Sequence, residues 1–341
     1  MLGYRGVAVT VKGLGLGKGP MWQTALDCMG SEKNLQQCRI KLISQPCSRF
    51  RPAAVTCSNI ASDVDAALSS LLPQECGQTE DASTHFLTML TKVRGGLTPT
   101  RFSTPWLVNL RFNDARRDIS CGGNIISEDL VLTAAHCLGF GTSSLVVRVG
   151  DHNTGYYEDT EQEFTLENVF IHEDYYASAP VNNDIALLKL NRKGGRGIRF
   201  GPKVRPICLP KTTDSYHTLR SCTVVGWGPM YFGGKLAQVP QEASINVLPD
   251  VLCESDPSYG TSDRFTSSMV CIGVTGRPVN TCKGDSGGPL SCSRKEDGRR
   301  TVYGLSSFGS GCRVSETNDV FTRVSKFLPW ILKTIRISMS S

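Results

Sequence analysis

Short apolar stretches separated by glycine and proline run through most of the chain, and they predict β-strands rather than helices. Three clear examples are the stretches 145–149, 221–227 and 301–305. Short strands with frequent turn residues between them are typical of all-β proteins, and here they favour two β-barrels. Near the end of the chain, Phe327, Ile331 and Ile335 recur at helical spacing, which predicts a helix over 325–337.

The first 58 residues follow a different pattern, with closely spaced glycines and cysteines. Glycines alternate along 13–19, and four cysteines follow at positions 28, 38, 47 and 57. Glycines mark turns, so we expect a small module held together by disulfides. After it, residues 58–75, which are small and polar around 66–72, indicate either a short helix or a linker.

Composition excludes several classes of function. The formal net charge is +6 over 341 residues, and the longest basic cluster, 294–300, is interrupted by Glu296 and Asp297. We interpret that cluster as a solvated loop and expect no nucleic-acid partner. No segment has the length and apolarity of a membrane span.

The 14 cysteines say more than the charge does about the compartment in which the protein folds. They lack the spacing of metal ligands, so disulfides and an oxidising compartment are expected. The chain nevertheless opens without the basic and apolar regions of a signal peptide. We therefore expect a secreted protein whose N-terminus is incomplete in this sequence.

The stretch 281–290, Thr-Cys-Lys-Gly-Asp-Ser-Gly-Gly-Pro-Leu, is a candidate for nucleophilic chemistry. Ser286 lies among glycines, which permit a tight turn that brings backbone N–H groups close to a bound carbonyl. The N–H groups of Gly284 and Ser286 are candidates for an oxyanion hole. A serine hydroxyl needs an adjacent base to act as a nucleophile near neutral pH.

Two further motifs supply a base and a carboxylate. His136 ends the apolar stretch Val-Leu-Thr-Ala-Ala-His-Cys over 131–137, and imidazole is suited to taking and returning a proton near neutral pH. Asp184 opens the apolar stretch that ends at Leu190. A carboxylate there can hold the histidine in one tautomer and stabilise the imidazolium.

These motifs, together with Lys-Val-Arg-Gly-Gly at 92–96 and Pro105-Trp106, resemble the chymotrypsin/trypsin family of serine endopeptidases. The resemblance runs from about residue 93 to 335. It implies two six-stranded antiparallel β-barrels with a C-terminal helix, and a catalytic triad of His136, Asp184 and Ser286. No cofactor is required for this chemistry, and the partners implied are protein substrates and protein inhibitors.

The same resemblance implies activation by proteolysis. Cleavage after Lys92 would free the amine of Val93, which in the family inserts and pairs with the carboxylate that precedes the nucleophile, here Asp285. The family usually has Ile-Val or Ile-Ile after the cut, and Arg94 departs from that pattern.

Five disulfides follow from the family's pattern. They are Cys121–Cys137, Cys222–Cys292, Cys253–Cys271, Cys282–Cys312 and Cys76–Cys208. The last of these would keep the N-terminal region attached after cleavage.

The first 58 residues resemble the C-terminal half of a scavenger receptor cysteine-rich (SRCR) domain, through Gly-Pro-Met-Trp at 19–22 and the cysteines that follow. That family implies a Cys28–Cys38 pair. Cys47 and Cys57 have no upstream partners in this chain, so they pair with each other, pair differently or stay free. The expected organisation is a partial SRCR-like module (1–58), a linker and pro-region (59–92) and a protease domain (93–341).

The primary specificity pocket departs from the trypsin pattern. Asn280 stands where trypsin-like members have Asp at the pocket base, while Ser307, Phe308 and Gly309 resemble the segment that lines the pocket. Asp319 stands where the family usually has Gly. Either its carboxylate lines the pocket and alters the preference among lysine, arginine and apolar residues, or it faces solvent.

The loop 150–161 resembles the family's calcium loop, with Asp151 and Glu161 at two carboxylate positions. Carboxylate oxygens are hard ligands of the kind that calcium requires. An acidic surface loop without a metal is the alternative.

We therefore expect a secreted serine endopeptidase zymogen with unusual primary specificity. Two alternatives are a catalytically silent homologue with a binding or regulatory role, and a receptor-type adhesion protein in which the protease domain is secondary. The intact triad argues against the first and the half-length module against the second.

Overall fold

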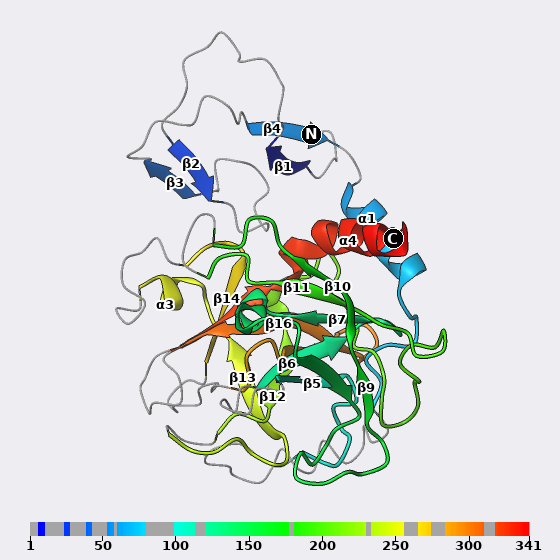
Figure 1. Cartoon of the computed structure of the whole chain (residues 1–341). Coiled ribbons are helices and arrows are strands. Elements are labelled where there is room, and N and C mark those ends of the chain that lie inside the picture. The colour runs from blue at the N-terminus through cyan, green and yellow to red at the C-terminus, as the bar shows by residue number, and fades with distance from the viewer. Residues whose placement is uncertain are drawn as a thin grey trace. The chain divides into compact units, whose positions relative to one another are not determined.

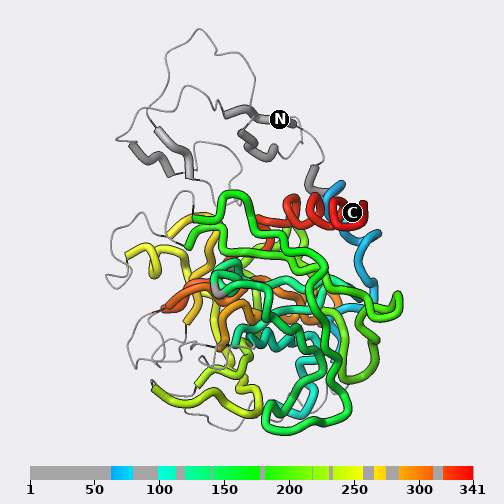
Figure 2. Tube along the Cα trace, viewed as in Figure 1, coloured from blue at the N-terminus to red at the C-terminus, as the bar shows by residue number. Residues whose placement is uncertain are grey.

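The computed structural model describes residues 6–10, 24–27, 39–42, 53–57, 60–79, 99–112, 120–176, 181–229, 233–255, 265–273, 284–309 and 318–340. The chain divides into two compact units, Met1–Ala66 and Ala67–Ser341. Figures 1 and 2 show the elements of each unit along the chain. Lys92, Val93, Asn280 and the cysteines at 28, 38, 47, 282 and 312 lie outside the described residues.

The first unit contains two antiparallel strand pairs. Strand β1 (Gly6–Thr10) pairs with β4 (Ala53–Cys57), and β2 (Thr24–Asp27) pairs with β3 (Arg39–Leu42). Helix α1 (Ile60–Leu71) follows and continues into the second unit. The helix interpretation of 58–75 is therefore confirmed, and the helix occupies most of that stretch, which has no glycine or proline between 60 and 71.

The second unit begins with a seven-stranded antiparallel sheet in the order β10-β11-β7-β6-β5-β8-β9. Its strands are β5 (Leu107–Phe112), β6 (Ser120–Ile125), β7 (Leu130–Thr133), β8 (Leu145–Val149), β9 (Gln162–Phe164), β10 (Leu166–Ile171) and β11 (Ala186–Leu190). The two edge strands, β9 and β10, are consecutive in the chain and separated only by Thr165. The sheet therefore curls, and its two edge strands join at the bend in the chain at Thr165.

The remaining strands form a closed six-stranded barrel in the order β12-β13-β14-β17-β16-β15. They are β12 (Arg220–Gly226), β13 (Gln241–Val247), β14 (Met269–Gly273), β15 (Pro289–Ser293), β16 (Arg300–Phe308) and β17 (Asp319–Arg323). The short helix α3 (Val251–Glu254) leads toward β14, and the 3-10 turn η5 (Val324–Phe327) leads into α4 (Leu328–Ser340). The all-β prediction with a terminal helix is confirmed. The first half, expected as a six-stranded barrel, is a sheet of seven strand segments with β9 and β10 at its edges, because the bend at Thr165 divides one strand.

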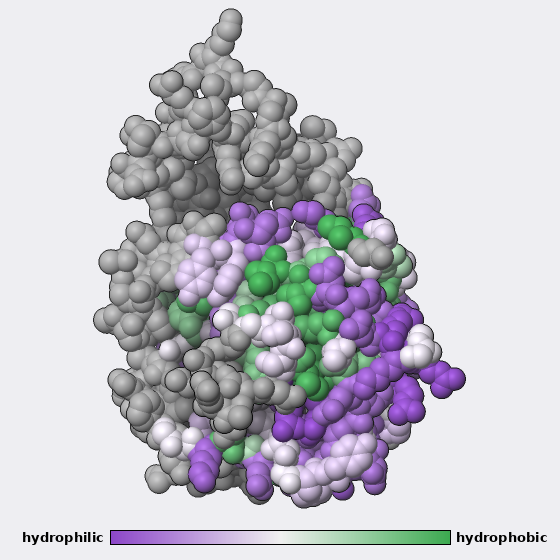
Figure 3. All heavy atoms as spheres, viewed as in Figure 1, coloured by the Kyte–Doolittle hydropathy of each residue, from purple (hydrophilic) through white to green (hydrophobic). Residues whose placement is uncertain are grey.

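Each sheet encloses its own apolar core. Val108, Leu110, Val131 and Val147 are fully buried in the first, whereas Leu290, Phe321 and Ile272 fill the second. On the face drawn in Figure 3, hydrophobic residues gather near the middle of the described surface and hydrophilic residues border them. None of the helices in the described part of the chain has the length and apolarity needed to cross a bilayer.

The segment 72–79 is fastened to the second barrel. Cys76 forms a disulfide with Cys208, as expected. Beside it, the Gly77 N–H donates to Pro206 O (2.8 Å), and Gly77 O accepts from the Arg300 N–H (2.9 Å). Gly77 has a φ of +66°, and a Cβ at this position would lie 2.2 Å from Arg300 O.

Gly77→Ala is therefore expected to lower the thermal midpoint of the protein by several degrees, because the strained φ and the backbone clash act together. Gly298→Ala is the matched control: Gly298 has a φ of +72° but no atom within 4 Å of the added Cβ. The measurement is thermal unfolding of both variants. Equal shifts would mean that the close approach to Arg300 does not contribute.

Candidate active site

His136 is positioned by the end of strand β7. The strand ends at Thr133, and the 3-10 turn η2 (Ala135–Phe140) begins two residues later. Ala134 and Ala135 are almost fully buried, and their small side chains let the turn pack closely against the first sheet. This packing holds His136 at the barrel edge with part of its side chain exposed, 24% by area.

The Asp184 carboxylate holds His136 through two hydrogen bonds, one to the backbone and one to the imidazole. The His136 backbone N–H donates to Asp184 Oδ1 (2.9 Å), and His136 Nδ1 lies 2.7 Å from Asp184 Oδ2. A carboxylate oxygen can only accept, so the proton of a neutral ring is on Nδ1 and the lone pair is on Nε2. The imidazole is thus fixed in the tautomer of a general base.

The Asp184 carboxylate is buried, with none of its side chain exposed. Ser307 Oγ donates a third hydrogen bond to it, at 2.5 Å from Oδ2. Thr322 Oγ1 donates to the Asp184 backbone oxygen at 2.8 Å, which fixes the main chain. These partners offset the cost of burying a charge. Sequence reasoning expected Ser307 in the substrate pocket and missed this contact.

Ser286 lies in a tight turn that packs between β6 and β16. Its backbone oxygen accepts from the Gly122 N–H (2.7 Å), and the Gly287 N–H donates to Ser306 O (2.8 Å). The turn uses positive φ at Gly284 (+105°) and Gly287 (+75°). A Cβ on Gly287 would lie 2.3 Å from Thr133 Oγ1, so glycine is needed for the close approach to β7.

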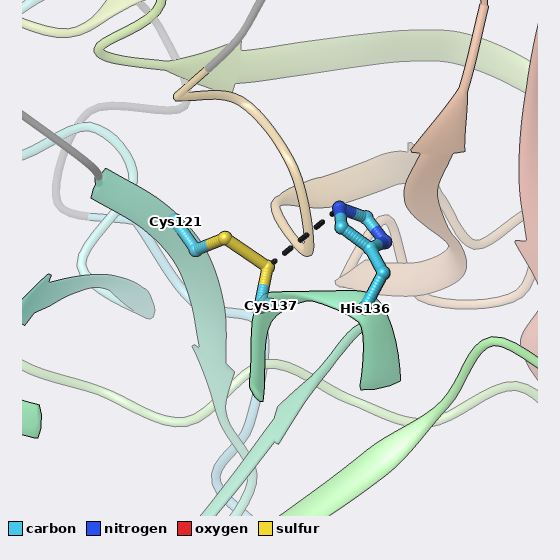
Figure 4. A group of neighbouring side chains, drawn as sticks. All are labelled: Cys121, His136 and Cys137. Carbon is cyan, nitrogen blue, oxygen red and sulfur yellow. Dashed lines mark hydrogen bonds between the residues drawn. A yellow bond between two sulfur atoms is a disulfide. The ribbon is translucent and has the colours of Figure 1, made fainter. Parts of the chain in front are cut away.

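The disulfide Cys121–Cys137 lies between Ser286 and His136. Cys137 Sγ is 3.6 Å from Ser286 O and 3.9 Å from His136 Nε2. Figure 4 shows the second contact as a dashed line between the disulfide and the imidazole. A disulfide sulfur carries no proton and cannot act as a thiolate ligand, so this cluster is not a metal site. The contacts place the Ser286 main chain and the imidazole against one sulfur atom.

Asp285 turns its carboxylate away from Ser286 toward strand β12. Asp285 Oδ1 accepts from the Gly228 N–H at 2.8 Å. A Cβ on Gly226 or Gly228 would lie 2.1 or 2.4 Å from a carboxylate oxygen of Asp285, so both glycines leave room for it. The expected partner, Val93, is outside the described residues.

At the end of β16, Gly309 lies against the side chain of Asp319. A Cβ on Gly309 would be 2.0 Å from Asp319 Oδ1, and Asp319 is only 2% exposed. The structure thus excludes the alternative in which Asp319 faces solvent. Phe308 pairs with Val320 of β17 next to this position. Asn280 lies outside the described residues.

Three carboxylates converge in the loop 150–161, those of Asp151, Glu158 and Glu161. Burial raises the pKa of Asp151, and the nearby Glu161 charge raises it further. Asp151 Oδ1 is buried without a hydrogen-bond partner among the described residues. The donor set is all oxygen and includes this unsatisfied atom, so the residues fit a calcium ion. Glu158 was not predicted as a ligand, although its spacing from Glu161 was visible in the sequence.

Two more disulfides agree with the expected pairs, Cys222–Cys292 within the second barrel and Cys253–Cys271 between α3 and β14. The pairs Cys28–Cys38 and Cys282–Cys312 stay predictions, because these residues lie outside the described part of the chain.

Comparison with known proteins agrees with this geometry. Residues 93–331 match the family model described as Trypsin, and residues 1–58 match that of the scavenger receptor cysteine-rich domain. Ovochymase-2 of Mus musculus is 32% identical over 283 residues, which are 79% of this chain and 45% of that protein. The chain thus spans less than half the length of this relative. With more than half of its residues in the Trypsin match, the chain belongs to the trypsin family of serine proteases and carries an SRCR segment before the protease domain.

Proposed function

We propose that this protein is a secreted serine endopeptidase, made as a zymogen, that hydrolyses peptide bonds through Ser286, His136 and Asp184. The observation that carries the proposal is the buried Asp184 carboxylate, which fixes His136 by two hydrogen bonds, while Cys137 Sγ contacts both the imidazole and the backbone oxygen of Ser286. A catalytically silent homologue would retain a buried charge at a cost without using it.

In the proposed reaction, Ser286 Oγ attacks the carbonyl carbon of the substrate while His136 Nε2 takes its proton. His136 then returns that proton to the leaving amine, and Asp184 stabilises the imidazolium between the two transfers. The N–H groups of Gly284 and Ser286 stabilise the negative charge on the substrate oxygen. Water then attacks the acyl carbon while His136 Nε2 takes a proton from it, and His136 returns that proton to Ser286 Oγ as the ester bond breaks and the acid leaves.

Activation is proposed to follow cleavage after Lys92. The new amine of Val93 would pair with Asp285, whose carboxylate already occupies the space left by Gly226 and Gly228. An ammonium and a carboxylate buried together offset a desolvation cost that neither charge alone could. The Cys76–Cys208 disulfide would keep the cleaved N-terminal region attached.

Ser286→Ala and Asp184→Asn test the triad. After limited trypsin treatment, we expect cleavage of a mixed peptide library by the native sequence and a new N-terminus at Val93. Ser286→Ala should abolish cleavage, and Asp184→Asn should lower kcat by about 10⁴-fold because an amide that donates to Nδ1 holds the imidazole in the wrong tautomer. Ser127→Ala, away from the site, serves as a control. Correct processing without Ser286-dependent cleavage would favour the silent homologue.

We further propose that Asp319 sets the primary specificity by lining the pocket beside Gly309. Two charges 4 Å apart attract by about 1 kcal/mol even at the dielectric constant of water. This energy corresponds to a factor of about five in a rate or binding constant. Asp319→Gly is therefore expected to lower cleavage after lysine relative to leucine by about fivefold or more. The measurement is the ratio of kcat/KM for paired lysyl and leucyl peptides. An unchanged ratio would rule out this role.

Asp151, Glu158 and Glu161 are proposed to hold a calcium ion that stabilises the loop. At a hundredfold excess over Kd, binding adds about 2.7 kcal/mol to the free energy of unfolding, which raises the thermal midpoint by roughly 5–10 °C. Glu161→Gln should remove this calcium-dependent rise. Glu163→Gln is the matched control, since Glu163 is exposed and paired with Arg148. If calcium leaves the midpoint of the native sequence unmoved, the loop is only an acidic surface.

Secretion is proposed because disulfides hold the second unit together and because both matched domains are typical of extracellular proteins. A protease domain implies protein substrates. Protein inhibitors are proposed as further partners.

A further inference from the structure

The segment 191–205, Asn-Arg-Lys-Gly-Gly-Arg-Gly-Ile-Arg-Phe-Gly-Pro-Lys-Val-Arg, contains six basic residues and no acidic residue. It connects β11 to the chain that reaches Cys208, and most of it is exposed. We call it the basic loop. The proposed active site uses none of its residues.

Four cations of the basic loop are exposed and form no ion pair within the described part of the chain: Lys193, Arg196, Arg199 and Lys203. Among the acidic groups near them, Asp151 lines the same pocket as Lys203 and also lies 3.7 Å from Arg148. Asp129 is paired with Lys189 and with Arg192 of the loop. Glu163 is paired with Arg148, while Glu128 and Glu167 act on Arg192. The four cations therefore keep an excess of positive charge.

Two tight turns and strand β9 arrange these cations along one edge of the first sheet. Lys193 and Arg196 form an antiparallel bridge across Gly194 and Gly195, and directly opposed residues project to the same face. Lys193 Nζ lies 5.8 Å from the ring centroid of Phe164 in β9.

Arg199 is fixed to the other end of the same strand. Its backbone N–H donates to Gln162 Oε1 (2.9 Å), and its oxygen accepts from Gln162 Nε2 (3.0 Å). Gln162 and Phe164 are two residues apart, or about 7 Å along a strand. Lys203 lies within the second turn, which Gly201 and Val204 close by an antiparallel bridge, and its Nζ is 5.0 Å from the ring centroid of Phe102. The cations thus form a row and not a single point of charge.

We propose that the basic loop binds a sulfated polysaccharide of the extracellular matrix or cell surface. Such a chain carries repeated anionic groups, which a row of exposed lysines and arginines matches without base-specific or apolar contacts. Protein partners and single-stranded nucleic acids fit less well. Phe200, 37% exposed, is the only large apolar side chain exposed within the loop, whereas protein interfaces and single-stranded nucleic acids use several aromatic contacts.

The contrast with the cluster at 294–300 supports this assignment. There Asp297 lies between basic residues and pairs with Arg294 and Arg299. Both segments are rich in basic residues, but the cluster leaves one exposed cation, Lys295, without a carboxylate partner among the described residues, whereas the basic loop leaves four.

Binding of the full chain to heparin, measured over a range of salt concentrations, tests the proposal. Lys193→Ala/Arg196→Ala should weaken binding by roughly fivefold per cation removed. The slope of log K against log salt should fall by about two. Arg199→Ala/Lys203→Ala should give a similar loss. Arg294→Ala/Arg299→Ala removes the same charge from the cluster, where both arginines pair with Asp297, and should change the affinity less than twofold.

Absence of heparin binding at physiological salt would overturn the proposal, as would an equal loss in the control variant. Polyglutamate, duplex DNA and phosphatidylserine vesicles are the competing probes. If any of them binds as tightly as heparin and loses affinity in Lys193→Ala/Arg196→Ala, the polysaccharide assignment is wrong. Ser286→Ala should bind heparin as the native sequence does, so a failure of the proposed catalysis leaves this result unaffected.

Discussion

The buried carboxylate of Asp184 is the constraint around which the site is arranged. An ionised group without solvent must accept hydrogen bonds on its oxygens, and here the donors come from η2 and β16. Strands from both sheets must therefore meet at one position with little freedom of adjustment. The first sheet supplies the imidazole, and the second supplies Ser307 and Thr322. The site can form only when the two sheets pack against each other.

Small residues make that packing close enough. Gly122 and Gly287 bring β6 and the turn of Ser286 together, and Gly226 with Gly228 leaves the space for Asp285. In each case a methyl group would meet a backbone or carboxylate atom well inside contact distance. The glycines around the proposed nucleophile are thus required by neighbours far away in the sequence as well as by the local turn.

Much of the candidate active site was predictable from the sequence. The motifs of His136, Asp184 and Ser286 each join a reactive residue to small neighbours, and they follow one another in a recognisable order. The strand-rich pattern and the terminal helix were predictable for the same reason, since periodicity is a local property. The contacts of Ser307 with Asp184 and of Gly77 with Arg300 were not, because they join residues more than a hundred positions apart. The charge of the basic loop was visible in the sequence, but its lack of carboxylate partners depends on the fold.

The bend at Thr165 also bears on how the first sheet avoids pairing with strands of other molecules. It leaves β9, only three residues long, as an edge strand of the first sheet. Exposed sheet edges invite pairing with strands of other molecules, and natural proteins prevent this with short edge strands and charged side chains. Here Gln162 is occupied by the backbone of Arg199, and Lys193 lies over Phe164. The edge is therefore protected against aggregation by the same segment that carries the unpaired positive charge.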